Sequence, residues 1–171
     1  MILSGREIKK HLGTKIIIEQ FNEKQLNPNS YNLKLHNELL IYDEEILDMK
    51  RNNKTKTITI PEEGFVLQPN TLYLGRTTEY VKTDYYVPKL EGRSSIARLG
   101  IFVHICAGLG QIGSSGCWTL EIACVQPVRI YPHIEICQLF FQTIEGEYNL
   151  YTKKYKDNRD IQPSMLYKEL K

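Results

Sequence analysis

The chain has 171 residues, a length that fits one domain over residues 1–171 with a core of its own. Its net charge of +2 comes from 22 basic and 20 acidic residues, and this balance excludes the broad basic surface of a nucleic-acid-binding protein. No apolar run approaches the roughly 20 residues of a membrane helix, and the N-terminus lacks a signal-peptide pattern. We therefore expect no membrane association and a cytoplasmic location.

The first predicted element is a short N-terminal helix. Ser4 and Glu7 have the spacing of a capping box. Ile8 and Leu12 fall on one helical face, and Gly13 favours a helix end. After it the pattern changes to short runs of β-branched and aromatic residues separated by turn residues, which predicts a mainly β fold of the sandwich or jelly-roll type. The expected strands cover residues 57–60, 72–74, 85–87, 101–103, 118–125, 128–131 and 134–141.

Two segments depart from this β pattern. Residues 94–99 lie between two glycines and are predicted to form one short helix, capped by Ser94 or Ser95. Backbone N–H groups at the start of such a helix would point at a phosphate. The end of the chain, from about residue 148 to 171, is polar and basic, and we expect it to be a mobile tail.

The cysteines test for a hydrolytic zinc centre, in which the metal activates a water. Such a centre needs a His-x-Glu and a Pro-Cys-x-x-Cys motif. Here no two cysteines have that spacing, and His104-x-Cys106 is the nearest approach to a ligand pair. Without a secretion signal, disulfides are not expected either. We interpret the four cysteines as small residues of a β core: Cys106, Cys117, Cys124 and Cys137.

The strongest functional signal lies between Glu91 and Glu121. Residues 92–100 read GRSSIARLG, a combination of arginine forks, hydroxyl donors and glycines that suits phosphate binding. Glu121 is flanked by Leu120 and Ile122, and a carboxylate in apolar surroundings is suited to general acid–base work. Alternatively, the arginines form surface ion pairs and the serines cap a turn. Phosphate binding together with a single acid–base group indicates chemistry on a nucleotide.

In this order the motifs resemble the dCTP deaminase branch of the dUTPase superfamily. The resemblance rests on Gly-Arg-Ser-Ser-x-Ala-Arg-x-Gly, on Val103-His104-x-x-Ala107, and on Gly-x-x-x-Leu-Glu ending at Glu121. The fold that it implies is a dUTPase-like distorted jelly-roll or β-barrel with a short N-terminal helix and a mobile C-terminal tail. Weaker matches are Met1–Ser4, Asn27–Leu33, Ile136–Phe140, and Lys154-Tyr155 with Asn158.

The resemblance implies zinc-independent hydrolytic deamination of dCTP to dUTP and ammonia, in the synthesis of dUMP and dTTP. The enzyme would be a hydrolase acting on a cyclic amidine C–N bond. Glu121 would be the general acid–base, Arg98 would orient it, and Ser94 would help to hold the attacking water. The expected substrate-binding residues are Arg93, Ser95, Ala107, Gln111, Gln138, Tyr148, Lys154, Tyr155 and Asn158.

The resemblance also implies a metal and an assembly. Mg²⁺ bound to the triphosphate is the expected cofactor, with no metal ligand from the protein. Members of this branch are homotrimers whose sites lie between subunits, so the arginine–serine motif and Glu121 of one site are expected to come from different chains.

One departure from the pattern affects the expected product. Gln111 stands where the branch usually has an aspartate, which in the dUTPase relatives helps to activate the hydrolytic water. Because an amide cannot act as a base, we predict dUTP rather than dUMP and pyrophosphate. Two alternatives stay open: a dUTPase or bifunctional dCTP deaminase and dUTP diphosphatase, and a non-catalytic nucleotide-binding regulator of the same fold.

Overall fold

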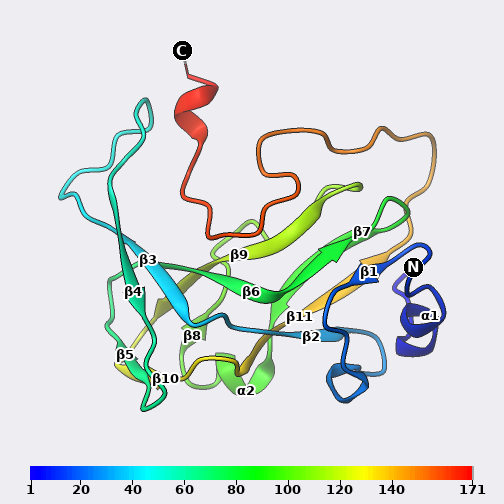
Figure 1. The fold of residues 1–171 in the computed structure, drawn as a ribbon, viewed down its shortest axis with the longest axis horizontal. Coiled ribbons are helices and arrows are strands. Elements are labelled where there is room, and N and C mark those ends of the chain that lie inside the picture. The colour runs from blue at the N-terminus through cyan, green and yellow to red at the C-terminus, as the bar shows by residue number, and fades with distance from the viewer. Residues whose placement is uncertain (171) are drawn as a thin grey trace.

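The computed structural model describes residues 1–170 and is mainly β, as predicted (Figure 1). The helices are α1 (Gly5–Lys10) and α2 (Ser94–Ala97), with 3₁₀ turns η1 (Glu23–Gln25) and η2 (Leu166–Lys168). The strands are β1 (Ile17–Ile18), β2 (Tyr31–Lys34), β3 (Glu38–Tyr42), β4 (Thr55–Thr59), β5 (Phe65–Leu67), β6 (Tyr73–Lys82), β7 (Val87–Gly92), β8 (Ile101–Phe102), β9 (Ser115–Cys124), β10 (Val128–Ile130) and β11 (Glu135–Gln142). None of the helices in residues 1–170 has the length and apolar character that a membrane crossing requires.

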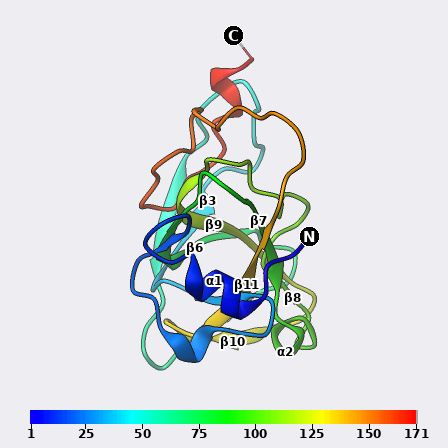
Figure 2. The same cartoon turned by 90° about the vertical axis from the view of Figure 1, so that its right-hand side faces the viewer.

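The strands form antiparallel sheets around one core. A six-stranded sheet has the order β4-β3-β6-β9-β8, with β1 paired to β6, and a second sheet has the order β2-β11-β7. A further pair joins β5 and β10. Figure 2 looks toward α1, behind which both larger sheets enclose the core. The fully buried core side chains come from both sheets and include Tyr31, Leu33, Leu120, Ile122, Leu139 and Phe141.

The N-terminal helix forms for the predicted local reasons. The Ser4 hydroxyl accepts a hydrogen bond from the Glu7 backbone N–H at 3.3 Å, and Ile8 is completely buried. The helix ends at Lys10, and Gly13 follows in a turn with a φ of 74°. That left-handed backbone favours glycine.

The predicted strand over residues 85–87 begins later than expected. The backbone N–H groups of Tyr85 and Tyr86 donate to the Thr83 hydroxyl at 3.3 and 3.2 Å. These bonds close a turn, and β7 therefore starts at Val87. The sequence pattern also missed β3 and β5 and most of β6, where polar and apolar residues alternate less regularly.

The predicted helix at residues 94–99 is present as α2, but its cap differs. Arg93 occupies the N-cap position and no side chain caps the helix. Ser94 and Ser95 therefore lie in the first turn instead of preceding it, and both are exposed. The prediction that one of these serines caps the helix was wrong by one residue.

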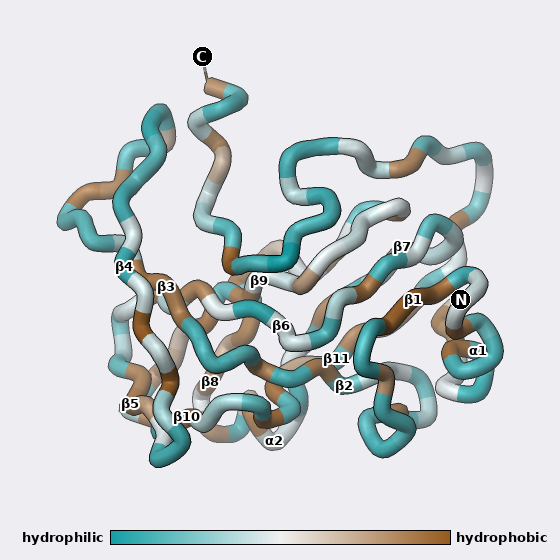
Figure 3. The backbone as a smooth tube through the Cα atoms, viewed as in Figure 1, coloured by the Kyte–Doolittle hydropathy of each residue, from teal (hydrophilic) through white to brown (hydrophobic). Residues whose placement is uncertain are grey.

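After β11 the chain runs across the top of the molecule in Figure 1 and returns along β9. The Cys117 N–H donates to the Asn158 carbonyl at 2.7 Å, and the Asp157 N–H donates to the Ser115 carbonyl at 2.8 Å. These bonds add the tail to a free edge of β9, because β8 pairs only with the other end of that strand. In Figure 3 the segment after β11 is mostly hydrophilic, in keeping with its predicted polar character.

Candidate active site

A cavity of about 660 Å³ lies between the outer face of β6 and β9, the loop after β8, and the returning tail. Its volume is in the range of small-molecule sites. Five predicted site residues line it: Ala107, Gln111, Glu121, Tyr155 and Asn158. The structure thus brings together residues of the central motif and of the tail.

The alternation of β9 places Glu121 on the cavity wall. Leu120 and Ile122 are completely buried in the core, so the side chain between them points to the opposite face. The apolar residues around the Glu121 carboxylate are therefore not Leu120 and Ile122. They include Leu74, which pairs with Glu121 across β6 and β9 and also lines the cavity. One carboxylate oxygen accepts a hydrogen bond from the Ile105 backbone N–H at 3.1 Å. Glu121 has no ion pair within residues 1–170.

The charges around this cavity are unusual for a nucleotide site. Among residues 1–170, its lining includes no lysine or arginine, and Glu121 is its only carboxylate. A phosphate chain is normally bound by cationic side chains. The cavity of one chain therefore offers an acid–base group and hydrogen-bonding surface, but no charged ligand for phosphates.

The arginine–serine motif lies elsewhere in the same chain. Ser94 and Ser95 belong to α2, Arg98 follows it, and all three residues are exposed. Arg98 has no ion pair or side-chain hydrogen bond in the described part of the chain, residues 1–170. Because β8 joins α2 to the last residues of β9, α2 lies beyond Glu121 and does not line the cavity.

Two further predicted site residues, Arg93 and Gln138, lie beside α2 and contact neighbouring residues there. The Arg93 guanidinium donates to the Glu135 carbonyl at 2.6 Å and lies 3.5 Å from the Glu135 carboxylate. Gln138, also on β11, donates to the Gly92 carbonyl at 3.1 Å. Arg93 and Gln138 thus adjoin the arginine–serine motif rather than the cavity.

The tail residues divide in the same way. Tyr155 and Asn158 line the cavity, whereas Tyr148 does not and is exposed. Lys154 forms an ion pair with Glu169, which raises the pKa of the lysine. Its ammonium also lies 5.2 Å from the centre of the Tyr155 ring. Lys154 therefore approaches the cavity only through Tyr155.

Side-chain contacts that the sequence did not reveal hold the tail in place. The Asp157 carboxylate accepts hydrogen bonds from the Ser115 hydroxyl at 2.5 Å and the Tyr80 hydroxyl at 2.9 Å, which hold the pKa of Asp157 below its usual value. Arg159 donates two hydrogen bonds to the Glu19 carboxylate, at 2.7 and 2.8 Å. Both contacts join residues too distant in sequence for any local pattern to indicate them.

The loop that carries Gln111 is fixed at both ends. The Gly110 N–H donates to the Pro88 carbonyl at 2.8 Å, and the Gly113 N–H donates to the Thr83 carbonyl at 3.0 Å. Gly113 has a φ of 82°, which few other residues adopt without strain. The Gln111 side chain is exposed and forms no hydrogen bond within residues 1–170. Its amide is therefore available to a ligand or water in the cavity.

The cysteines do not assemble with other metal-binding residues. Within residues 1–170, no three His, Cys, Asp or Glu side chains are grouped so as to hold a metal ion. Cys117, Cys124 and Cys137 are buried, as predicted, and burial raises the pKa of each thiol. Cys106 is exposed in the loop after β8, so its prediction as a core residue was wrong. A raised thiol pKa disfavours the thiolate that would bind zinc. Zinc independence remains a prediction.

Known proteins are similar to this chain over nearly its whole length. A family profile described as dCTP deaminase-like matches residues 2–144. A protein named "dCTP deaminase, dUMP-forming" from Clostridium acetobutylicum is 64% identical over 170 residues, covering 99% of this chain and 98% of that protein. A protein of the same name from Cytophaga hutchinsonii is 59% identical over 170 residues, with the same coverage.

A solved structure supports the fold. The 2'-deoxycytidine 5'-triphosphate deaminase from Agrobacterium tumefaciens superposes with a TM-score of 0.67 at 18% identity, covering 86% of this chain and 50% of that chain. At this identity the likeness concerns the fold alone. The predicted fold class is confirmed.

Proposed function

The chain belongs to the dCTP deaminase-like family, and from this premise we propose that it converts dCTP to dUMP, ammonia and pyrophosphate. The observation that carries the proposal is the position of Glu121, which among residues 1–170 is the only carboxylate lining a cavity of about 660 Å³. The relatives at 64% and 59% identity, which span nearly the whole chain, bear this activity in their names.

The first step is hydrolysis of the bond between the cytosine ring and its exocyclic amine. Glu121 takes a proton from a water as the water oxygen bonds to the amine-bearing carbon. The same carboxyl group passes this proton to the ring nitrogen, and then moves the remaining proton of the new hydroxyl group to the amine. The C–N bond breaks to release ammonia, and the oxygen stays on the carbon as the carbonyl of uracil. The backbone of Ala107 and the Ser94 hydroxyl hold the water, and Arg98 orients Glu121. The Ile105 N–H donates to only one oxygen of the Glu121 carboxylate, so the other oxygen is available for proton transfer.

The phosphate-binding part of the site comes from a second copy of the chain, within a homotrimer. The cavity lacks any cation, whereas Arg98 is exposed and unpaired within residues 1–170. Apolar side chains on the adjoining segments are exposed as well: Leu99, Phe102 and Val125 are 49, 55 and 65% exposed. Large exposed apolar side chains that lie together mark an interaction surface. Burying this surface against another subunit would bring the arginine–serine motif to that subunit's cavity.

The second step corrects our prediction of dUTP as the product, because the names of the relatives state dUMP. That prediction assumed that hydrolysis needs a carboxylate at position 111. Phosphoryl transfer has a loose transition state, in which orienting the water matters more than removing its proton, and glutamine does this in other phosphohydrolases. The Gln111 amide orients a water toward the α-phosphorus. The water oxygen bonds to that phosphorus as the bond from the phosphorus to the bridging oxygen breaks. Pyrophosphate leaves with the electron pair of the broken bond and one water proton, and the other proton goes to the phosphate of dUMP or to solvent.

The remaining predicted residues bind and cover the nucleotide. Arg93, Ser95 and Gln138 contact the phosphates, whose charge Mg²⁺ carried by the nucleotide partly neutralises. Tyr155, with Lys154, closes the tail over the base and excludes water. The product dUMP places the reaction in pyrimidine deoxynucleotide synthesis, for which a cytoplasmic location is proposed.

Variants of Gln111 test the two-step assignment. Gln111→Ala should release ammonia from dCTP at near the normal rate, while pyrophosphate release falls by at least about tenfold, since only the second water loses its partner. Gln162 is a matched control, because its amide also lines the cavity but is occupied by Asn158 at 2.7 Å. Gln162→Ala should not separate the two products. If Gln111→Ala releases both products as the unmodified enzyme does, the assignment of Gln111 fails.

A further inference from the structure

The segment Asn27–Asn32, which runs from the turn after η1 into β2, buries polar side chains that have no role in the mechanism above. Ser30 is 1% exposed and Asn32 is 5% exposed. Buried polar groups are retained only when hydrogen-bonded, and each such group restricts the geometry of its partners. The partners of this segment lead to Arg93 by two routes.

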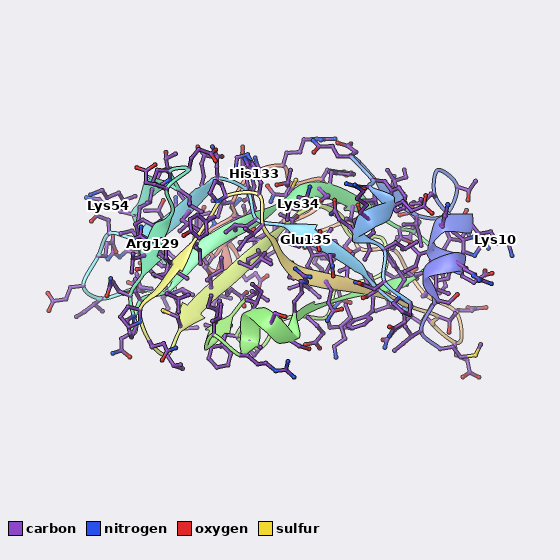
Figure 4. The ribbon with its side chains drawn as sticks, turned by 90° about the horizontal axis from the view of Figure 1, so that it is seen from below. Lys10, Lys34, Lys54, Arg129, His133 and Glu135 are labelled. Carbon is purple, nitrogen blue, oxygen red and sulfur yellow. The ribbon has the colours of Figure 1, made fainter. Side chains whose placement is uncertain are left out.

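The first route runs through Glu135. The Asn32 side-chain amide donates to a Glu135 carboxylate oxygen at 2.7 Å. The same carboxylate lies 3.5 Å from the Arg93 guanidinium, and the Glu135 carbonyl accepts from Arg93 at 2.6 Å. Figure 4 shows Glu135 where β2 and β11 lie side by side, next to its cross-strand partner Lys34. Asn32 therefore fixes the carboxylate that fixes the arginine.

The second route ends at the residue before Arg93. Asn27 donates from its amide to Asn32 at 2.7 Å and to the Ser30 hydroxyl at 3.1 Å. That hydroxyl donates to Gln138 at 2.8 Å, and Gln138 donates to the Gly92 carbonyl at 3.1 Å. The backbone that enters α2 is thus held by the same segment as the Arg93 side chain.

The buried carboxylate of Glu79 holds the backbone of β2 at and beside Asn32. Glu79 is 2% exposed and accepts from the Gln25 amide at 2.8 Å and from the Lys34 N–H at 2.9 Å. Gln25 also donates to the Asn32 carbonyl at 2.9 Å. Burying a carboxylate is costly unless it is hydrogen-bonded, so these contacts fix β2 firmly against β6.

We propose that Asn32 is a positioning residue that acts through Glu135 to hold Arg93 for the triphosphate of the substrate. The inference rests on the proposed function, in which Arg93 contacts phosphate. A free arginine loses rotamer freedom when it binds, and one held in advance loses less. Loss of the Asn32 contact should therefore weaken binding of the phosphate chain and leave binding of the nucleoside unchanged.

The test compares Asn32→Leu with Gln25→Leu, which removes an equally buried amide of the same network on the side away from Arg93. We expect Asn32→Leu to raise the KM and Kd for dCTP about three- to tenfold, with kcat nearly unchanged. The Kd for deoxycytidine, which has no phosphate, should not change. Gln25→Leu should lower thermal stability without this discrimination between the two ligands. Glu135→Gln, at a partly exposed position, serves if Asn32→Leu does not fold, and should shift the Kd in the same direction.

A double-mutant cycle with Arg93→Gln decides whether Asn32 acts through Arg93. In the Arg93→Gln background, Asn32→Leu should add little to the Kd for dCTP. The proposal is overturned if the two changes are additive, if deoxycytidine binding weakens equally, or if Arg93→Gln alone leaves the Kd for dCTP unchanged. Failure of the unmodified chain to release ammonia from dCTP would instead overturn the proposed function, and the Kd comparison would still test the positioning.

Discussion

Replacing Glu121 by glutamine should abolish deamination while leaving the fold intact. The amide has the shape of the carboxylate, and its oxygen can still accept the Ile105 N–H that now donates at 3.1 Å. The side chain is only partly buried and has no ion pair within residues 1–170 that the change would break. What the substitution removes is the ability to take a proton from water.

The two effects differ in size enough to be separated. Replacing a charged acceptor by a neutral one costs about 1 kcal/mol of folding stability. For a domain of this size that corresponds to a fall in Tm of roughly 2–4 °C. Loss of a general base lowers the rate by about 10²–10⁴-fold, or roughly 2.7–5.5 kcal/mol of activation free energy.

The assay measures ammonia release, Tm and dCTP binding for the same preparation. Glu38→Gln is a suitable control, because Glu38 lies in the same sheet but does not line the active-site cavity. It should keep normal turnover. Turnover by Glu121→Gln within about threefold of the unmodified rate would refute the assignment of Glu121 as the general base. Loss of folded protein would instead contradict the prediction that the substitution preserves the fold.

Three further predictions concern the metal and the tail. Purified protein should contain no stoichiometric zinc, whereas removing Mg²⁺ with a chelator should abolish turnover and adding Mg²⁺ should restore it. Gly116→Ala should raise the KM for dCTP about tenfold, because the added Cβ would lie 2.6 Å from the Asn158 carbonyl and displace the tail. Gly146→Ala is the control: Gly146 also has a positive φ, but its Cβ would meet no atom within 4 Å, so the KM should not change. Hydrogen bonds from Ser115 and Tyr80 hold the pKa of Asp157 below about 3.9, the value expected in the unfolded chain. Ionised Asp157 therefore stabilises the docked tail fully above about pH 4. This stability is lost as the pH falls through the lower pKa of the folded state. Fluorescence of the single tryptophan, which lines the cavity, should report that loss, and Asp157→Asn should remove it.

That Ala107, Gln111 and Glu121 lie at one cavity could be predicted because they come from one short stretch of chain. The loop that carries Ala107 and Gln111 leads directly into β9, which carries Glu121. Strand alternation then places Glu121 opposite the buried Leu120 and Ile122. Local pattern and resemblance therefore agreed on these residues.

The parts that the sequence could not reveal depend on pairing between distant segments. Arg159 binds Glu19, and Arg93 binds Glu135, across separations that no periodicity describes. The prediction that Arg98 orients Glu121 was made for a site shared between two chains, and within residues 1–170 of one chain the two side chains are not in contact. It therefore stays a prediction.

The most direct test of the proposed function is a product balance at complete conversion of dCTP. Ammonia, pyrophosphate and the remaining nucleotide are measured in the same reaction, beside Glu121→Gln as a control. We predict equal amounts of ammonia and pyrophosphate, with dUMP as the nucleotide, and neither small product from the control. Ammonia with accumulated dUTP and no pyrophosphate would contradict the second step, and no ammonia from the unmodified protein would contradict the proposed function as a whole.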